Sequence, residues 1–196
     1  MNEQNIVCFS DLDENGKRAA IALFVDGFGH MFTFAKTRDE LLRLFADSFQ
    51  KELVYVYLSN NMVAGFLGLG TNTKTALKGN AQVCKDLFGK GKGGIVYAQL
   101  FRRAEKPKVE KDTDLYIDFL TTSVHMRKQG IATKLLNFAC ALPGYTECYL
   151  DVLSKNVTAA TLYESLGFVT YKKKLSIFTF VQGLGHLILM KKRVDE

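Results

Sequence analysis

An alternation of strand-like and helix-like segments in the C-terminal half constrains the fold of this chain more than any other feature. Residues 115–121 and 148–153 are short apolar stretches of the kind that form buried strands. Each is followed by a segment whose apolar side chains recur at helical spacing, at residues 130–142 and 157–166. The second helix is expected to end at Gly167, because glycine readily adopts the left-handed conformation of a helix cap. Strands that alternate with helices in this way predict an α/β fold with a mixed sheet.

The rest of the chain adds further strands and helices to this pattern. Strands are expected at residues 6–9, 53–58, 62–69, 177–181 and 186–190, helices at 14–34, 38–49, 81–88 and 95–103, and a glycine-rich break at 89–94. A chain of 196 residues is long enough for one domain with a buried core. We therefore expect a single domain over residues 1–196. Residues from about 70 to 112 would form an insertion in it, because connections between elements are usually much shorter.

Charge and hydropathy exclude several classes of protein. The formal net charge of +6 suits an anionic ligand, but the basic residues are too dispersed to predict a nucleic-acid partner. The longest apolar stretch, residues 19–34, contains Asp26 and His30 and is too short and too polar to span a membrane. The first four residues are unlike a signal peptide. We therefore expect a cytoplasmic protein.

The four cysteines do not indicate a metal site. Cys8, Cys84, Cys140 and Cys148 form no Cys-x-x-Cys pair, and no group of histidines accompanies them. Free thiols in a reducing compartment are the expected state.

A basic, glycine-containing turn stands between the strand at 115–121 and the helix that follows it. The turn includes Arg127, Lys128 and Gly130. The first turn of a helix has unpaired N–H groups and a partial positive charge, and glycine lets an anion approach the backbone closely. These residues predict a phosphate site, although a basic turn without a ligand would have the same local sequence.

Residues 114–168 resemble the GCN5-related N-acetyltransferase family, called GNAT. The family carries Arg/Gln-x-x-Gly-x-Gly/Ala after its fourth strand, matched here by Arg127, Gly130 and Ala132. Further along it carries Asn and then Leu-Tyr-Glu-x-Leu-Gly-Phe, matched by Asn156 and residues 162–168. The resemblance implies a GNAT-like α/β fold. Such a fold has a central mixed, mostly antiparallel sheet of six to seven strands, helices on both faces, and fourth and fifth strands that splay apart.

The resemblance also implies that acetyl-coenzyme A binds as co-substrate, without a metal. Backbone amides after Gly130 would hold its pyrophosphate, and its pantetheine arm would run beside the fourth strand. The expected cofactor-binding residues are Leu120, Thr122, Val124, Arg127, Lys128, Gln129, Gly130, Ile131, Ala132, Thr133 and Asn156. Thr122 and Val124 depart from the family's usual residues, but the contacts expected there are mostly main-chain. Asn156 also directly precedes a helix and fits an N-cap.

Three residues are candidates for catalysis. Helical spacing alone would favour a core position for Tyr163, but within the second GNAT motif we favour it as the general acid that protonates the leaving thiolate. Asp118 and Asp151, on the fourth and fifth strands, are alternative general bases. A chain of water molecules is a third route for the proton.

The expected activity is the transfer of an acetyl group from acetyl-coenzyme A to a primary amine, by direct attack in a ternary complex. The acceptor could be a small-molecule amine or a peptide or protein amine, and a homodimer stays open. We expect Phe32, Phe34, the insertion and the segment 178–186 to bound a partly aromatic acceptor pocket. A non-catalytic acyl-coenzyme A sensor is the alternative function. An unrelated nucleotide-binding protein is disfavoured, because its phosphate-loop motifs are absent.

Overall fold

A seven-stranded mixed sheet forms the centre of the molecule in the computed structural model, which describes residues 5–175 and 185–194. The strand order is β1-β2-β3-β4-β5-β7-β6, and all neighbouring strands are antiparallel except β4 and β5, which are parallel. The strands are β1 (Ile6–Cys8), β2 (Val54–Ser59), β3 (Met62–Gly70), β4 (Asp114–Thr122), β5 (Glu147–Leu153), β6 (Val169–Lys174) and β7 (Leu187–Arg193). The expected mixed, mostly antiparallel sheet is confirmed.

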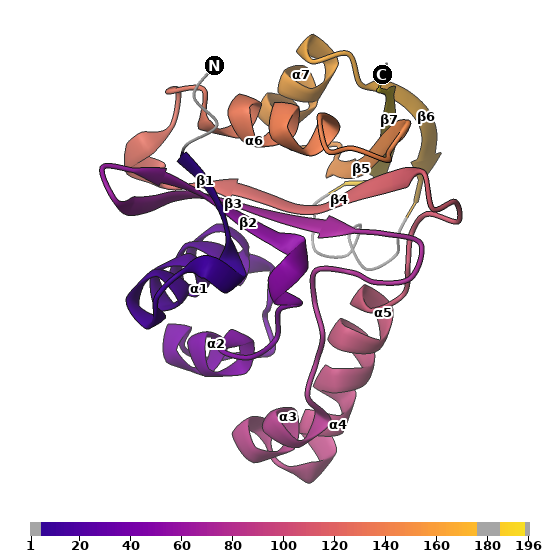
Figure 1. Ribbon diagram of the computed structural model, residues 1–196. Helices are drawn as coiled ribbons and strands as arrows, with labels where there is room; N and C mark the ends of the chain where they lie inside the picture. Colours follow the sequence, from indigo (N-terminus) through magenta and orange to yellow (C-terminus); the bar gives the residue numbers. More distant parts are fainter. Residues whose placement is uncertain (1–4, 176–184, 195–196) are drawn as a thin grey trace.

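Helices cover both faces of the sheet (Figure 1). One face carries α1 (Glu14–Phe28) and α2 (Arg38–Phe45), and the other carries α6 (Ile131–Cys140) and α7 (Val157–Ser165). Each face has its own cluster of buried apolar side chains, so the sheet separates two cores. No helix in the described part of the chain has the length and apolar character needed to cross a bilayer.

Phenylalanines dominate the core between the sheet and α1. The fully buried ring of Phe24 lies 5.0 Å from the rings of both Phe45 and Phe49, measured between centroids. It also lies 5.3 Å from Phe66 on β3 and 5.2 Å from Phe119 on β4. Aromatic pairs at these separations stabilise a fold beyond the area that they bury. The helical spacing of the N-terminal phenylalanines therefore reflects packing.

The C-terminal strands differ from expectation. Residues 177–181, expected to be a strand, lie outside the described residues. The strand expected at 186–190 is found as β7, close to where the sequence placed it. The strand next to β7 is β6, which starts directly after α7. Gly167, with φ of 88°, reverses the chain there. The sequence pattern hid β6 because every one of its side chains is exposed, including three consecutive lysines, as is common in an edge strand.

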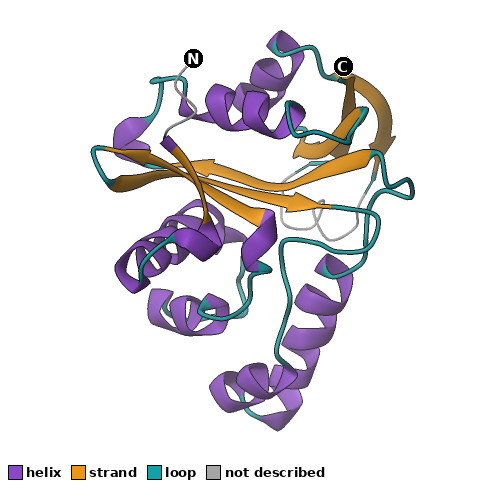
Figure 2. Ribbon diagram, viewed as in Figure 1, coloured by secondary structure: helices purple, strands orange, loops and turns teal. Residues whose placement is uncertain are grey.

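The long connection between β3 and β4, residues 71–113, is helical. It contains α3 (Ala81–Phe88), α4 (Lys90–Val96), a π-helix (η5, Tyr97–Phe101) and α5 (Arg102–Ala104), and these project away from the sheet (Figures 1 and 2). The expected glycine-rich break is confined to Gly89, and α4 begins immediately after it. The glycines within α4 serve packing instead, since a Cβ atom on Gly93 would clash with the backbone of Cys84 in α3.

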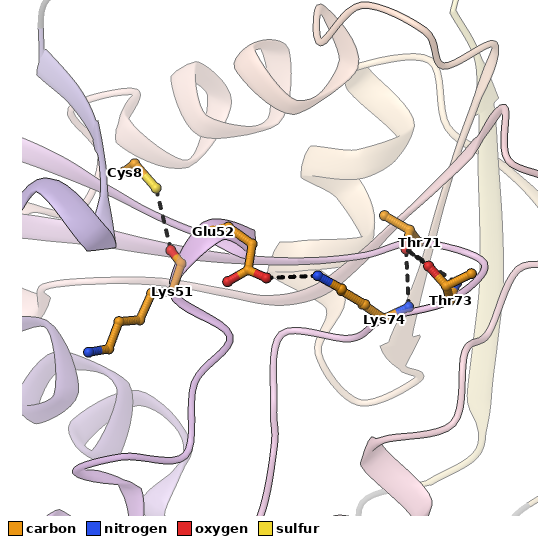
Figure 3. Close-up of polar contacts among 6 residues, drawn as sticks. All are labelled: Cys8, Lys51, Glu52, Thr71, Thr73 and Lys74. Carbon is orange, nitrogen blue, oxygen red and sulfur yellow. Dashed lines mark hydrogen bonds and ion pairs between the residues drawn. The ribbon is translucent and has the colours of Figure 1, made fainter.

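The start of this connection is fixed to the chain that precedes β2. Figure 3 shows the Thr71 hydroxyl accepting a hydrogen bond from the Lys74 N–H at 3.1 Å, while the Lys74 ammonium pairs with Glu52 at 3.0 Å. Further along, the Gln50 N–H donates to the Ala76 carbonyl at 2.9 Å. The segment around Ala76 is therefore held beside the sheet, where it contacts the candidate site.

Candidate active site

The parallel strands β4 and β5 separate after a short paired stretch. Their register runs from the pair Asp114–Glu147 to the pair Ile117–Leu150 and continues no further. The register between β3 and β4 also shifts here, so Asp118 is an extra residue in β4, a β-bulge. Bulges bend a strand and often occur next to active sites. The splay expected of the fourth and fifth strands is confirmed.

Asp118 and Asp151 meet at the point where the strands part. Each directly follows the last paired residue of its strand. The Lys108 ammonium, from the end of the β3–β4 connection, lies 3.1 Å from Asp118 Oδ1 and 3.7 Å from Asp151 Oδ1. The structure thus brings both candidate bases together and adds a cation between them.

Asp118 is a buried and fully engaged carboxylate. Its side chain is 3% exposed, and its second oxygen accepts a hydrogen bond from the Ala76 N–H at 3.0 Å. Burial raises the pKa of Asp118, while Lys108 and the Ala76 N–H oppose that rise. Both oxygens of Asp118 contact the segment between β3 and β4, one through Lys108 and one through the Ala76 N–H. Asp118 therefore fixes that segment to the bulge in β4.

Asp151 is more accessible. Its side chain is 32% exposed, and Oδ1 accepts a hydrogen bond from the Tyr116 hydroxyl. Burial, followed by the charge of Asp151, raises the pKa of Tyr116 far above its usual value, so this phenol stays a donor. Within the described residues no hydrogen bond reaches Asp151 Oδ2. That oxygen can therefore accept a proton or a hydrogen bond from a ligand.

Tyr163 lies on α7, close enough to Asp151 for the carboxylate to affect its ionisation. The side chain is largely buried and packs edge-on against Phe168, with ring centroids 6.0 Å apart. Burial, and then the negative charge of Asp151, raises the pKa of Tyr163 to about 12. Its hydroxyl has no hydrogen-bond partner in the described part of the chain. The side chain therefore combines core packing with a protonated hydroxyl free to donate.

The basic turn lies between β4 and α6 and has the geometry of an anion site. Lys128 and Gly130 adopt left-handed φ values of 62° and 74°. Gly130 is the N-cap of α6, and no side chain caps the first N–H groups of that helix. Arg127 is exposed, and a Cβ atom on Gly130 would meet nothing within 4 Å. Free N–H groups, positive charge and open space fit a pyrophosphate.

The other expected cofactor residues continue from the splay towards this turn. Leu120 and Thr122 lie on β4 beyond the bulge, and Val124, 64% exposed, lies in the following 3₁₀ turn. The side chain of Ile131 is buried in the core, so only its backbone can face a ligand. Gln129 is exposed, and Ala132 and Thr133 belong to the first turn of α6.

Asn156 caps α7, as its position in the sequence indicated. Its side-chain oxygen accepts a hydrogen bond from the Ala159 N–H at 3.2 Å. The side-chain amide donors take no part in the cap, so they can contact a ligand at the same time.

Two residues of this site were missed in the sequence. Tyr116 stands two residues before Asp118 on the same strand, and the strand period of two is a signal that could have found it. Lys108 had no such signal. It lies in a charged stretch of the connection, and only the fold brings it to the splay.

Phe32 and Phe34, expected to line an acceptor pocket, are partly buried and pack against other aromatic rings. The Phe32 ring lies 5.1 Å from Phe45, and the Phe34 ring lies 5.5 Å from Phe88 of α3, measured between centroids. Both rings join the core on the α1 face. Residues 178–184, the other expected aromatic wall, lie outside the described residues.

Comparisons with known proteins agree with this geometry. Residues 95–170 match the family model described as an acetyltransferase (GNAT) domain, whereas no curated protein sequence matches the chain. Three similar solved structures illustrate the fold. An N-acetyltransferase from Staphylococcus aureus Mu50 has a TM-score of 0.59 at 19% identity, covering 90% of this chain and 95% of its own. A GNAT family acetyltransferase from Bacillus cereus ATCC 10987 has a TM-score of 0.59 at 10% identity, covering 98% of each chain.

The third is the ribosomal-protein-S18-alanine N-acetyltransferase from Escherichia coli, with a TM-score of 0.57 at 14% identity, covering 97% of this chain and 94% of its own. At these identities the solved structures establish the fold, and the family model adds the sequence pattern of the α6 turn and α7. The chain thus has the GNAT acetyltransferase fold, and the resemblance to that family is confirmed over residues 95–170.

Proposed function

We propose that this protein transfers an acetyl group from acetyl-coenzyme A to a primary amine, by direct attack of the amine in a ternary complex. The observation that carries the proposal is the opening between β4 and β5. An accessible carboxylate, Asp151, and a protonated phenol, Tyr163, lie beside it, and an uncapped, basic helix start follows β4. These are a base, an acid and an anion site in one region.

The cofactor is assigned to the α6 turn and the free edge of β4. First-turn N–H groups of α6 would bind the pyrophosphate, with Arg127 and Lys128 adding positive charge. The pantetheine arm would follow β4 from Leu120 to Val124, where β5 no longer pairs with it. Asn156, at the start of α7, would contact the same arm with its amide.

Asp151 is the better candidate for the general base. An acceptor amine is mostly an ammonium ion near neutral pH and must lose a proton before it attacks. The Oδ2 atom of Asp151 can take that proton directly or through one water molecule, whereas both oxygens of Asp118 are already occupied. Asp118 is then a positioning residue that holds Lys108 and the chain at Ala76.

Tyr163 is assigned the role of general acid. The amine nitrogen forms a bond to the thioester carbonyl carbon, the carbon–sulfur bond breaks, and the thiolate takes a proton. A phenol whose pKa is raised to about 12 is fully protonated at neutral pH and can supply that proton. Orientation of the two substrates would contribute the remainder of the rate enhancement.

A panel of amines tests the proposal. Acetyl-coenzyme A is incubated with the protein and a small monoamine, a polyamine, a peptide with a free N-terminus, or an N-blocked peptide containing lysine, and free thiol is measured. We expect at least one class to release thiol well above the amine-free background, with an equal amount of acetylated amine. If acetyl-coenzyme A binds but no amine is acetylated, the protein is an acyl-coenzyme A sensor and the catalytic proposal is wrong.

A further inference from the structure

Lys108 is a primary amine that the fold places between the two candidate bases. We propose that Lys108 is itself an acceptor, so that the protein acetylates this side chain intramolecularly when acetyl-coenzyme A is present. The inference rests on the proposed function and adds to it a modification site within the chain.

The surroundings of Lys108 are those of an ammonium-binding site. Two carboxylates contact its Nζ atom, Asp118 at 3.1 Å and Asp151 at 3.7 Å, and the Tyr116 ring centroid lies 4.4 Å away. Carboxylates and an aromatic face are the groups that bind alkylammonium ions. An acceptor amine attacking at this opening would need the same surroundings, and Lys108 already has them.

The backbone holds Lys108 in this place. The neighbouring residue, Val109, is 7% exposed, and the connection returns from α5 to β4 along this side of the molecule (Figure 1). The Lys108 side chain keeps 36% of its surface exposed, so it is accessible to a reagent in the opening. A fixed backbone and an accessible amine give a high effective concentration of the nucleophile.

The transfer balances without any further reagent. The Lys108 ammonium gives one proton to the free oxygen of Asp151, and the neutral nitrogen attacks the thioester carbonyl carbon. The carbon–sulfur bond breaks, the thiolate takes a proton from Tyr163, and the second proton that the attacking nitrogen loses restores the Tyr163 phenol. The products are an amide on Lys108, free coenzyme A and one proton, which leaves to solvent as Asp151 and Tyr163 return to their starting states.

Other lysines with defined contacts in the described residues lie elsewhere. Lys74 pairs with Glu52 alone, Lys191 with Glu147, and Lys134 donates to the Tyr57 hydroxyl. Among the described residues, only Lys108 has an ion pair to either candidate base. We therefore expect selective acetylation of Lys108, whereas uncatalysed chemical acetylation would modify other exposed lysines as well.

Lys74 is the internal control for selectivity. Its side chain is 54% exposed, more than that of Lys108, and it also pairs with a carboxylate at 3.0 Å. Uncatalysed acetylation should modify Lys74 at least as fast as Lys108. A catalysed intramolecular transfer should modify Lys108 at least tenfold faster than Lys74, a threshold well below the rate gains that proximity can give.

The experiment incubates the full chain with isotopically labelled acetyl-coenzyme A and no acceptor, and quantifies acetylation of each lysine by peptide mass spectrometry. We expect one acetyl group per chain at Lys108, with a first-order rate that does not change when the protein is diluted. Lys108→Arg should abolish this modification and Lys74→Arg should leave it intact. Asp151→Asn should slow it by about 10²-fold.

Four outcomes would overturn the inference. Equal labelling of Lys74 and Lys108 would show uncatalysed chemistry, and a rate that rises with protein concentration would show transfer between molecules. An unlabelled Lys108 in a protein that acetylates an added amine would leave the proposed function standing and refute this inference alone. If no amine, added or internal, is acetylated, both fall together.

Discussion

At the scale of single residues, two aspartates that occupy equivalent positions on adjacent strands have different environments. Asp118 is buried, paired with Lys108 and bonded to the Ala76 N–H, while Asp151 keeps one oxygen without a partner in the described residues. A base must both lose and accept protons during turnover, which favours the accessible group. We therefore assign a positioning role to Asp118 and proton transfer to Asp151.

Asp151→Asn tests this assignment. The variant keeps the shape of the side chain and its hydrogen bond with Tyr116, and removes the basic oxygen. We expect turnover with a saturating acceptor to fall by about 10²-fold while the affinity for acetyl-coenzyme A is unchanged. Asp118→Asn is the matched comparison. It should lower the free energy of unfolding, since it weakens a buried ion pair, and it should lower turnover less than Asp151→Asn does. The reverse pattern would make Asp118 the base.

Tyr163→Phe separates proton donation from packing. The ring contact with Phe168 is kept and the hydroxyl is lost. We expect turnover to fall by about 10²-fold with little change in the free energy of unfolding, because the hydroxyl has no partner in the described residues to lose. Because the pKa of Tyr163 is raised to about 12, deprotonation of Tyr163 should not shape the pH–rate profile between neutrality and about pH 10. Full activity in the Phe variant would return Tyr163 to a purely structural role.

Single-residue roles were only partly predictable. Asp118, Asp151 and Tyr163 could be selected because they fall on strands or motifs that resemble a known family, but burial decides between the two aspartates and burial depends on the whole fold. Lys108 was unpredictable, because its contacts connect residues that are 10 and 43 positions apart. Local patterns carry no information on such pairings.

At the scale of elements, the start of α6 is the proposed anion site, and a second glycine provides a control for it. Gly130 directly precedes α6, and Gly144 lies in the turn that follows it. Their φ values are left-handed, 74° and 88°, and a Cβ atom on either glycine would meet nothing within 4 Å. Glutamate at either position should cost roughly 1–2 kcal/mol of backbone strain.

Only Gly130→Glu should also weaken acetyl-coenzyme A binding, by at least tenfold, because it places a negative charge at the helix start. Gly144→Glu should bind as the unaltered protein does. Calorimetric titration of both variants, together with chemical denaturation, distinguishes the two effects. Equal affinities in the two variants would move the phosphate site away from this turn.

The β3–β4 connection was the element that the sequence described least well. Its length suggested an insertion, but Phe101 of the π-helix is fully buried and its ring lies 6.2 Å from that of Phe45 in the main core. Helical spacing was visible at 81–88, whereas the glycine run concealed α4. Glycine is a weak helix former in isolation, and it is used in α4 because α3 packs closely against it.

Phe101→Ala should therefore destabilise the whole protein. We expect a loss of about 3–5 kcal/mol in the free energy of unfolding, as for other large core aromatics, measured by chemical denaturation. Tyr97→Ala is the comparison, because Tyr97 is on the same π-helix and only partly buried. A loss below about 1 kcal/mol in Phe101→Ala would show that the connection is an appendage to the domain.

At the scale of the whole molecule, the mixed, mostly antiparallel sheet and the splay of its fourth and fifth strands were predictable, whereas the exposed edge strand β6 was not. Periodicity indicated the alternation of strands and helices from residue 115 to residue 166, and the resemblance supplied the splay. The net charge of +6 was expected to serve an anionic ligand, yet residues 71–113 contain ten basic and four acidic residues and account for all of it. The proposed anion site consists instead of Arg127, Lys128 and the backbone at the start of α6.

The central claim is that acetyl-coenzyme A binds where β4 and β5 part, with its pyrophosphate at the α6 turn. Isothermal titration of the unaltered protein with acetyl-coenzyme A tests it most directly. We expect one site per chain with a dissociation constant on the order of micromolar, with binding weakened at least tenfold by Gly130→Glu and unchanged by Gly144→Glu. Absence of binding at millimolar acetyl-coenzyme A, in a protein shown to be folded, would contradict the account.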